Sequence, residues 1–293
     1  MPSARALALP LRPRARAVLP PAGLVAVAII AAACVAGPWV LGLDPNLTDP
    51  AASFAPPGGA HWLGTDELGR DMLARLLYGG RLSLAVAAGG VAIAFVLGTS
   101  WGVLAARRGG LADELLMRGA DMAMAVPQIL FGLVCVAAFG ASLTSLIVIT
   151  GLLLAPSSAR MARAVVLGEM TLDYYTAGIA YGAGPLRLML REVLPNTAPA
   201  LASQAVINAA SAMILEASLS FVGLGVQPPA MSWGVLLQQG YGYLYSDPKY
   251  AVCPAVAILA TILCLNLAAD RLGGGARRSA RRWARRWARR WAR

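Results

Sequence analysis

Few residues in this sequence are of the types that usually carry out chemistry. His61 is the only histidine, and the four cysteines form no CxxC pair. Catalytic triads and metal sites that need several histidines are therefore excluded. Metal binding or disulfide formation by the cysteines is not expected either, because cysteines within apolar runs usually behave as small hydrophobic residues. We expect no metal and no cofactor.

The only lysine decides whether the chain can hydrolyse ATP. A Walker A loop, G-x-x-x-x-G-K-[ST], needs a lysine after its glycines to hold nucleotide phosphates. Lys249 instead stands in the sequence Asp-Pro-Lys-Tyr. The sequence therefore predicts no ATPase activity and no enzyme. Active transport would take its energy from a partner protein or from an ion gradient.

Glu216 is a carboxylate inside an apolar run. An ionisable residue within a membrane is costly and is by default a candidate functional residue. A structural role is the alternative, in which the carboxylate lies near a helix end and bonds to a neighbouring backbone or to a partner subunit. Both interpretations stay open on the sequence alone.

These residues must be positioned by a largely apolar chain. Hydrophobic residues make up 58% of the sequence and charged residues 13%, whereas about 25% of residues are charged in a soluble domain. The chain is therefore predicted to be an all-α integral membrane protein. Six transmembrane helices are expected, at 22–43, 82–106, 122–139, 143–166, 199–222 and 251–269.

Polar segments connect or flank these spans. A basic N-terminal segment, 1–21, precedes the first helix, and an outer segment, 44–81, separates that helix from a five-helix core, 82–270. The second half of the outer segment, around 68–77, has an amphipathic pattern and is expected to lie on the membrane surface. An arginine-rich tail, 271–293, follows the core.

The distribution of basic residues predicts the orientation. Six spans place both termini on one side, and 21 of the 25 lysines and arginines fall on that side. Cytoplasmic loops carry an excess of lysine and arginine. We therefore expect a multi-pass membrane protein with both termini in the cytoplasm.

One polar stretch on the predicted cytoplasmic side, 173–196, reads DYYTAGIAYGAGPLRLMLREVLPN. Short helices are expected at 173–181 and 186–193, because two glycines and a proline between them interrupt a continuous helix. A second break is expected at Leu194-Pro195. The pattern predicts a helix–turn–helix hairpin that protrudes from the membrane, either as a docking element or as an ordinary loop.

Part of this hairpin resembles a known motif. TAGIAYG, followed after a helical piece by VLPN, is similar to the EAA motif of bacterial ABC-importer permeases, E-A-A-x-x-x-G and then I-x-L-P. Thr176 stands where the usual Glu would be, and Gly178 where the second Ala would be. The resemblance implies a role in ATPase coupling for the matched residues, Thr176, Ala177, Gly178, Gly182, Leu194 and Pro195.

Three more blocks extend the resemblance over roughly 61–271. HWLGTDELGRDMLARLLYGGRLSL, GLADELLMRGADMAMAVP and LEASLSFVGLGVQPPAMSWGVLL resemble blocks of the dipeptide/oligopeptide/nickel permease family, in the same order. This implies a MetI-like, type I importer permease in the cell inner membrane. It also implies a heterodimer with a related permease, two cytoplasmic ATPases and an extracytoplasmic solute-binding protein. The implied substrate is a peptide, or else nickel or another small solute.

The tail lies outside this resemblance. It repeats Arg-Arg-Trp-Ala with a period close to that of a helix, so that Trp283, Trp287 and Trp291 would lie near one another. Arginine and tryptophan together suit an anionic lipid surface, and no nucleic-acid partner is expected. A low-complexity extension without a specific function is the alternative.

Two other functions compete with an importer subunit. A gradient-driven secondary transporter would bind its coupling ion through ionisable groups near the midplane, and only Glu216 is available there. An intramembrane enzyme would need paired carboxylates or a nucleophile and base, which the sequence does not offer. The ABC-importer permease is therefore favoured, with the secondary transporter as the alternative.

Overall fold

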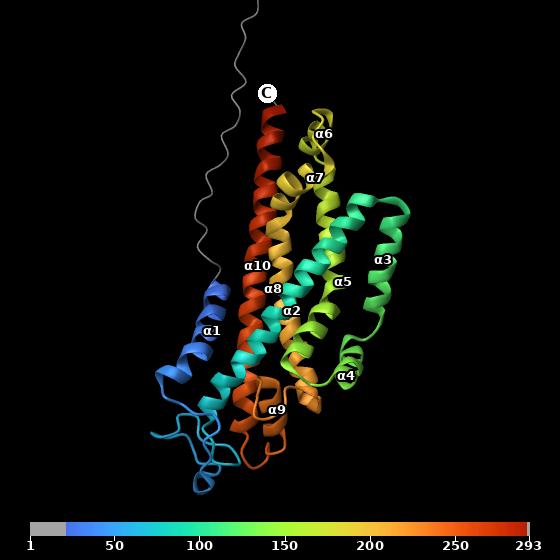
Figure 1. Cartoon of the computed structure of the whole chain (residues 1–293). Coiled ribbons are helices and arrows are strands. Elements are labelled where there is room, and N and C mark those ends of the chain that lie inside the picture. Colours follow the sequence, from blue (N-terminus) through green and yellow to red (C-terminus); the bar gives the residue numbers. More distant parts are fainter. Residues whose placement is uncertain (1–21, 292–293) are drawn as a thin grey trace, which may run out of the picture.

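A bundle of long helices forms the body of the molecule. The computed structural model describes the backbone of residues 22–291 and the side chains of residues 22–273. Within that part of the chain there are helices and loops and no strand. The long helices are α1 (Ala22–Val40), α2 (Met72–Arg108), α5 (Leu143–Met170), α8 (Leu194–Leu219) and α10 (Lys249–Trp291) (Figure 1). The predicted segment 1–21 lies outside the described residues, as do the side chains of the tail.

Shorter helices lie at the two ends of the bundle (Figure 1). The hairpin helices α6 (Asp173–Ala180) and α7 (Pro185–Leu188) are at one end, and α9 (Trp233–Tyr241) is at the other. The outer segment lies at the same end as α9 (Figure 1). We refer to these as the hairpin end and the outer end.

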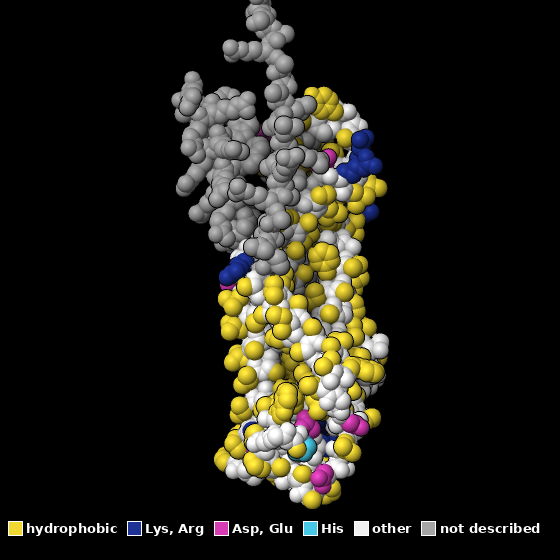
Figure 2. Space-filling model, turned by 90° about the vertical axis from the view of Figure 1, so that its left-hand side faces the viewer, with side chains coloured by type: hydrophobic (Ala, Val, Ile, Leu, Met, Phe, Trp, Pro, Cys, Tyr) yellow, Lys and Arg dark blue, Asp and Glu magenta, His cyan; other side chains and the backbone are white. Residues whose placement is uncertain are grey.

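The apolar surface and the helix lengths fit a membrane. Five helices in the described chain are long and apolar enough to cross one, or six if the bent pair of α3 (Gly110–Ala125) and α4 (Gln128–Phe139) is one span. Figure 2 shows a face covered mostly by hydrophobic side chains, with acidic side chains and the histidine at the outer end. The prediction of an all-α multi-pass membrane protein is confirmed.

Small residues let the two central helices approach closely. Gly90, Ala94, Gly98 and Gly102 are all buried and recur every fourth residue of α2, which places them on one face. A Cβ added to Gly98 would lie 2.3 Å from the Cβ of Ser158 in α5. Close backbone approach over small residues is the usual way in which membrane helices pack.

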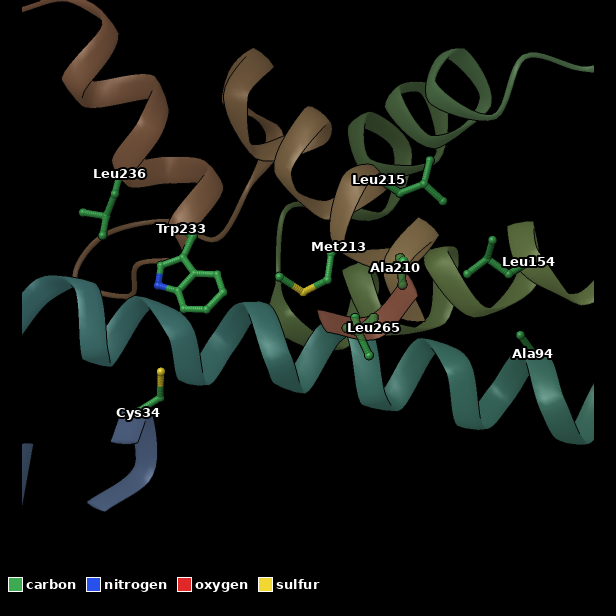
Figure 3. Packing of buried hydrophobic residues seen from close by; sticks show 11 residues of the cluster. Cys34, Ala94, Leu154, Ala210, Met213, Leu215, Trp233, Leu236 and Leu265 are labelled. Atoms are coloured by element: carbon green, nitrogen blue, oxygen red, sulfur yellow. The ribbon is translucent and has the colours of Figure 1, made fainter. Parts of the chain in front are cut away.

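Larger side chains fill the core toward the outer end. Trp233 of α9 and Met213 of α8 are buried in one cluster with Cys34 of α1 and Leu265 of α10 (Figure 3). The Trp233 indole N–H also donates to the Leu76 carbonyl of α2 at 2.7 Å. The short outer helix α9 is therefore fixed to the bundle.

The second helix begins earlier than expected, at Met72 and not at residue 82. Asp71 caps it by accepting a hydrogen bond from the Ala74 N–H at 2.7 Å. Met72, Ala74 and Arg75 are buried, so the prediction of an amphipathic stretch on the membrane surface is wrong. Met72 packs inside the protein, and Leu76 and Leu77 are half-buried against the core, whereas Leu68 is exposed; the amphipathic pattern alone could not distinguish this packing from contact with the membrane surface.

The third predicted span, 122–139, is broken into two helices. α3 and α4 meet at an angle of 85°. The break falls at Val126, which is extended with φ −80° and ψ 129° and precedes Pro127. A residue before proline disfavours the helical region, so the prediction of one continuous helix is wrong.

The expected break at Leu194-Pro195 is also wrong. The helix continues from α7 through a π-helical turn (Met189–Val193) into α8. Pro195 lies in the first turn of α8. The wider turn before it accommodates a proline that would otherwise interrupt the backbone hydrogen bonds.

Candidate functional site

The hairpin reverses direction at Gly182. The Gly182 N–H donates to the Ile179 carbonyl at 2.9 Å, and the Ala183 N–H donates to the Gly178 carbonyl at 3.0 Å. This pair of bonds is a Schellman motif. Gly182 has φ +76°, a left-handed conformation that glycine adopts without steric cost.

The two helices of the hairpin touch at Gly178. A Cβ added there would lie 2.5 Å from Cδ2 of Leu188 in α7. Leu188 is buried, so its side chain occupies the space that a larger residue at 178 would need. The glycine at this position, where the family motif has alanine, is thus explained by close packing within the hairpin.

The base of the hairpin is buried against the bundle. Met189 and Val193 of the π-helical turn pack with Val166 of α5 and Ala106 of α2, and all four are buried. Tyr175 of α6 packs against the same cluster. The base of the hairpin is therefore in direct packing contact with α2, α5 and the start of α8.

A hydrogen bond ties α6 to the end of α5. The Tyr174 hydroxyl donates to Oε2 of Glu169 at 2.7 Å. Partial burial, together with this carboxylate, raises the pKa of Tyr174 to about 12, although the Asn196 side chain opposes the shift. The hydroxyl therefore keeps its proton at physiological pH and remains a donor.

The outward face of the hairpin combines small residues with apolar ones. Thr176, Ala177 and Gly182 are exposed. Four large apolar side chains beside them are more than half exposed, namely Ile179, Tyr181, Leu186 and Leu190. Exposed apolar groups clustered at a helix end are typical of a protein interaction surface.

A shallow hollow of about 640 Å³ lies between α6 and α7. Ala177, Gly178 and Gly182 line it, and Thr176 is exposed in the same helix. The hollow is also lined by side chains that the sequence motif does not identify, namely Tyr174, Tyr181, Ala183, Arg187, Leu188, Arg191 and Glu192. Only Leu188 had a signal in the sequence: glycine stands at 178 where the motif has alanine, which indicates close packing of a larger side chain against that position.

Leu194 and Pro195 do not line this hollow. They begin α8 beyond the π-helical turn, and Leu194 packs against the buried cluster at the hairpin base. The structure thus places four of the matched residues on the hairpin and two at the start of the span that continues from it. The two halves of the motif lie on either side of the π-helical turn, which is continuous with α7 and α8.

Glu216 lies apart from the hairpin, near the outer end of α8. It is 1% exposed, and its carboxylate oxygens accept hydrogen bonds from Ser83 Oγ at 3.0 Å and from Ser220 Oγ at 2.7 Å. Ser83 Oγ in turn accepts from the Trp233 backbone N–H at 3.0 Å. The carboxylate connects α2, α8 and α9, which favours a structural role.

A family model described as "Binding-protein-dependent transport system inner membrane component" matches residues 98–282 of the chain. The match includes the whole hairpin and Glu216. The chain belongs to this family. It is a permease subunit of an ABC importer, as the resemblance of its motifs predicted.

Relatives of this permease are similar over most of their length. It is 38% identical over 258 residues to the di/tripeptide transport system permease protein DppC of Pseudomonas aeruginosa, covering 85% of this chain and 84% of the relative. It is 35% identical over 233 residues to the probable D,D-dipeptide transport system permease protein DdpC of Escherichia coli, covering 80% and 78%. The predicted relation to dipeptide permeases is confirmed.

A solved structure supports the fold. The inward-facing MetNI methionine ABC transporter matches with a TM-score of 0.58 at 24% identity, over 70% of this permease and 97% of that chain. At this level of identity the match shows a shared fold only. The predicted MetI-like permease fold is confirmed.

Proposed function

We propose that this permease carries peptides across the cell membrane and that its hairpin docks against a cytoplasmic ATPase. The peptide substrate is supported by the relatives described above, whose names specify di/tripeptide and D,D-dipeptide transport. The docking role is supported by one observation above all. The hairpin exposes small and apolar residues, while its base is packed against three spans.

ATP hydrolysis is assigned to partner subunits, because the chain has no Walker A loop. The remaining partners are a related permease, which forms a heterodimer with this chain, and an extracytoplasmic binding protein. Of the 25 lysines and arginines, 21 lie in segments predicted to share a side with the hairpin, among them Arg107, Arg108, Arg187 and Arg191. This excess of positive charge supports a cytoplasmic hairpin end and cytoplasmic termini.

At position 176, contact with the ATPase depends on shape and not on charge. Thr176 is exposed and uncharged, so it supplies no carboxylate to an ion pair. The hollow and the apolar side chains around it provide a surface into which a partner side chain fits. Removal of exposed apolar area from water favours such a contact, and the net affinity is what remains after the costs of association and ordering.

A secondary transporter is the alternative function, and Glu216 would have to bind its coupling ion. Both carboxylate oxygens of Glu216 already accept serine hydroxyls in the structure. A structural role for Glu216, which these hydrogen bonds favour, supports the ATP-driven importer.

Uptake measured in proteoliposomes tests this proposal. We expect a labelled peptide to enter only when the partner permease, the ATPases and the binding protein are reconstituted with this chain and ATP is supplied on the hairpin side. Uptake by this chain alone under a proton or sodium gradient would establish the secondary transporter instead.

A further inference from the structure

The span formed by α3 and α4 is broken at Val126-Pro127, where the chain bends by 85°. All residues from 121 to 127 are exposed, so the rest of the described chain does not cover this break. The carbonyls of residues 123–126 and the N–H groups of residues 128–130 have no hydrogen-bond partner among the residues that the structure describes. The break therefore exposes a set of unpaired polar backbone groups.

This break lies at a depth that corresponds to the interior of the membrane. The side-chain nitrogen of Gln128, which begins α4, is 3.5 Å from the Leu153 carbonyl of α5. A Cβ added to Gly132 would lie 3.6 Å from the side chain of Leu153. Leu153 is about ten residues from the outer end of α5 at Leu143, or about 15 Å along the helix axis. Because the hydrocarbon core is about 30 Å thick, the break is near its middle.

Lipid cannot satisfy the backbone groups at this depth. Hydrocarbon offers neither donors nor acceptors, so non-helical backbone within a membrane occurs only where protein buries it or where it lines a water-filled cavity. The exposed break is not buried by its own chain. Either water or a partner subunit must therefore cover it.

Charged side chains on the same helix favour water. A hollow of about 430 Å³, which we call the charged hollow, lies beside α3 on the hairpin side of the break (Figure 1). Five of its seven lining residues are charged, namely Asp113, Glu114, Arg118, Asp121 and Arg163. Asp121 lies 3.4 Å from Arg160 of α5, and both side chains are more than half exposed. Charged residues within a span almost always face a bundle interior or a water-filled cavity, so the charged hollow and the break form one hydrated face.

We propose that this face of α3, from the charged hollow to the break at Val126-Pro127, lines the water-filled path of the solute through the assembled permease. Water, or the polar groups of a passing solute, satisfies the exposed carbonyls and N–H groups at the break. The ion pairs of the charged hollow remain hydrated where the path opens toward the hairpin side. That the solute is a peptide rests on the proposed function; access of water to the break does not.

Thiol labelling tests whether water reaches the break. The four native cysteines are replaced by alanine, and a single cysteine is introduced at Ala125, which is exposed at the end of α3. The assembled transporter is placed in membrane vesicles with the hairpin side outward. A charged, membrane-impermeant methanethiosulfonate is then added with and without ATP, and the rate of labelling is measured.

Ala32→Cys is the matched control in the same background. Ala32 is exposed about halfway along α1, a helix that contains no charged residue. Because a thiol must ionise to react, Ala125→Cys is expected to be labelled at least about tenfold faster than Ala32→Cys in one or both conditions. Labelling after denaturation verifies that both thiols are present, and the modified Ala125→Cys transporter should lose uptake of labelled trialanine.

The outcomes separate this proposal from the proposed function. Equal labelling rates for the two variants in both conditions would overturn the path. Labelling of Ala125→Cys in this chain alone but not in the assembled transporter would also overturn it, because a partner subunit would then cover the break. Labelling that leaves trialanine uptake unchanged would show a hydrated break outside the solute path. Absence of ATP-driven trialanine uptake before labelling would count against the proposed function and leave the labelling result standing.

Discussion

The conformation of Gly182 allows a quantitative test of the hairpin. Its φ of +76° lies in the left-handed region, where an L-residue with a Cβ costs about 1–2 kcal/mol. An added Cβ at this position would meet nothing within 4 Å, so Gly182→Ala introduces backbone strain without a clash. If the ATPase binds only the native turn and this strain drives the free hairpin out of that turn, the affinity falls by a factor of up to about 5–30.

The assay is ATPase binding to the permease in nanodiscs, measured as a dissociation constant. Asn tolerates the left-handed conformation better than other residues, so Gly182→Asn is expected to fall between glycine and alanine. Gly184→Ala is the matched control. Gly184 lies in the same hairpin at φ −62°, where alanine is not strained, and its added Cβ also meets nothing within 4 Å.

The order expected for the dissociation constants is wild type and Gly184→Ala lowest, then Gly182→Asn, then Gly182→Ala. Equal dissociation constants for the two alanine variants would refute the argument, because only one of them strains the turn. An unchanged constant for Gly182→Ala would show that the turn is not required for docking.

Three further predictions concern single contacts. Gly178→Ala, which restores the residue usual in the family, should weaken ATPase binding because its Cβ meets Leu188 at 2.5 Å, and Leu188→Ala should rescue it in a double-mutant cycle. Glu216→Ala should lower the free energy of unfolding by on the order of 3 kcal/mol, seen as an earlier thermal transition in detergent, whereas Glu216→Gln should lose less; equal losses would contradict the hydrogen-bonding role. Tyr174 has its pKa raised from 10.0 to about 12, so the folded state keeps a proton that the unfolded state loses, and stability should fall as pH rises across that interval. Tyr174→Phe should remove this pH dependence in denaturation curves, and its persistence would assign it to another group.

Much of the fold could be predicted because apolar length is a strong signal. The spans, the hairpin and its turn at Gly182 follow from runs of apolar residues and from the glycines and proline that interrupt them. Gly182 in particular has one physical reason to be glycine, its positive φ. Such local requirements can be inferred without a structure.

Features that depend on tertiary packing could not be inferred in this way. The start of α2 at Met72 depends on burial of a charged residue, Arg75, whose partners lie in α9 and α10. The π-helical turn that keeps the chain helical up to Pro195 is set by burial of Met189 and Val193. Neither the contacts of Arg75 nor the burial of Met189 and Val193 produces a periodic pattern in the sequence.

The same limit applied to the candidate site. The motif identified the small residues of the hairpin but not the large one, Leu188, against which Gly178 packs. Glu216 could be singled out by its charge, yet its serine partners come from α2 and from the turn after α8. Its hydrogen bonds required the three-dimensional structure.

Site-specific photo-cross-linking tests the central claim most directly. Tyr181 at the hairpin and Tyr245 at the outer end are 91% and 103% exposed, so a photoreactive phenylalanine analogue can replace either one with little disturbance. In the assembled transporter, we predict that the analogue at 181 cross-links to the ATPase and that the analogue at 245 does not. Cross-linking of the ATPase from 245, or its absence from 181 in a complex active in ATP-driven uptake, would contradict the assignment of the hairpin as the coupling element.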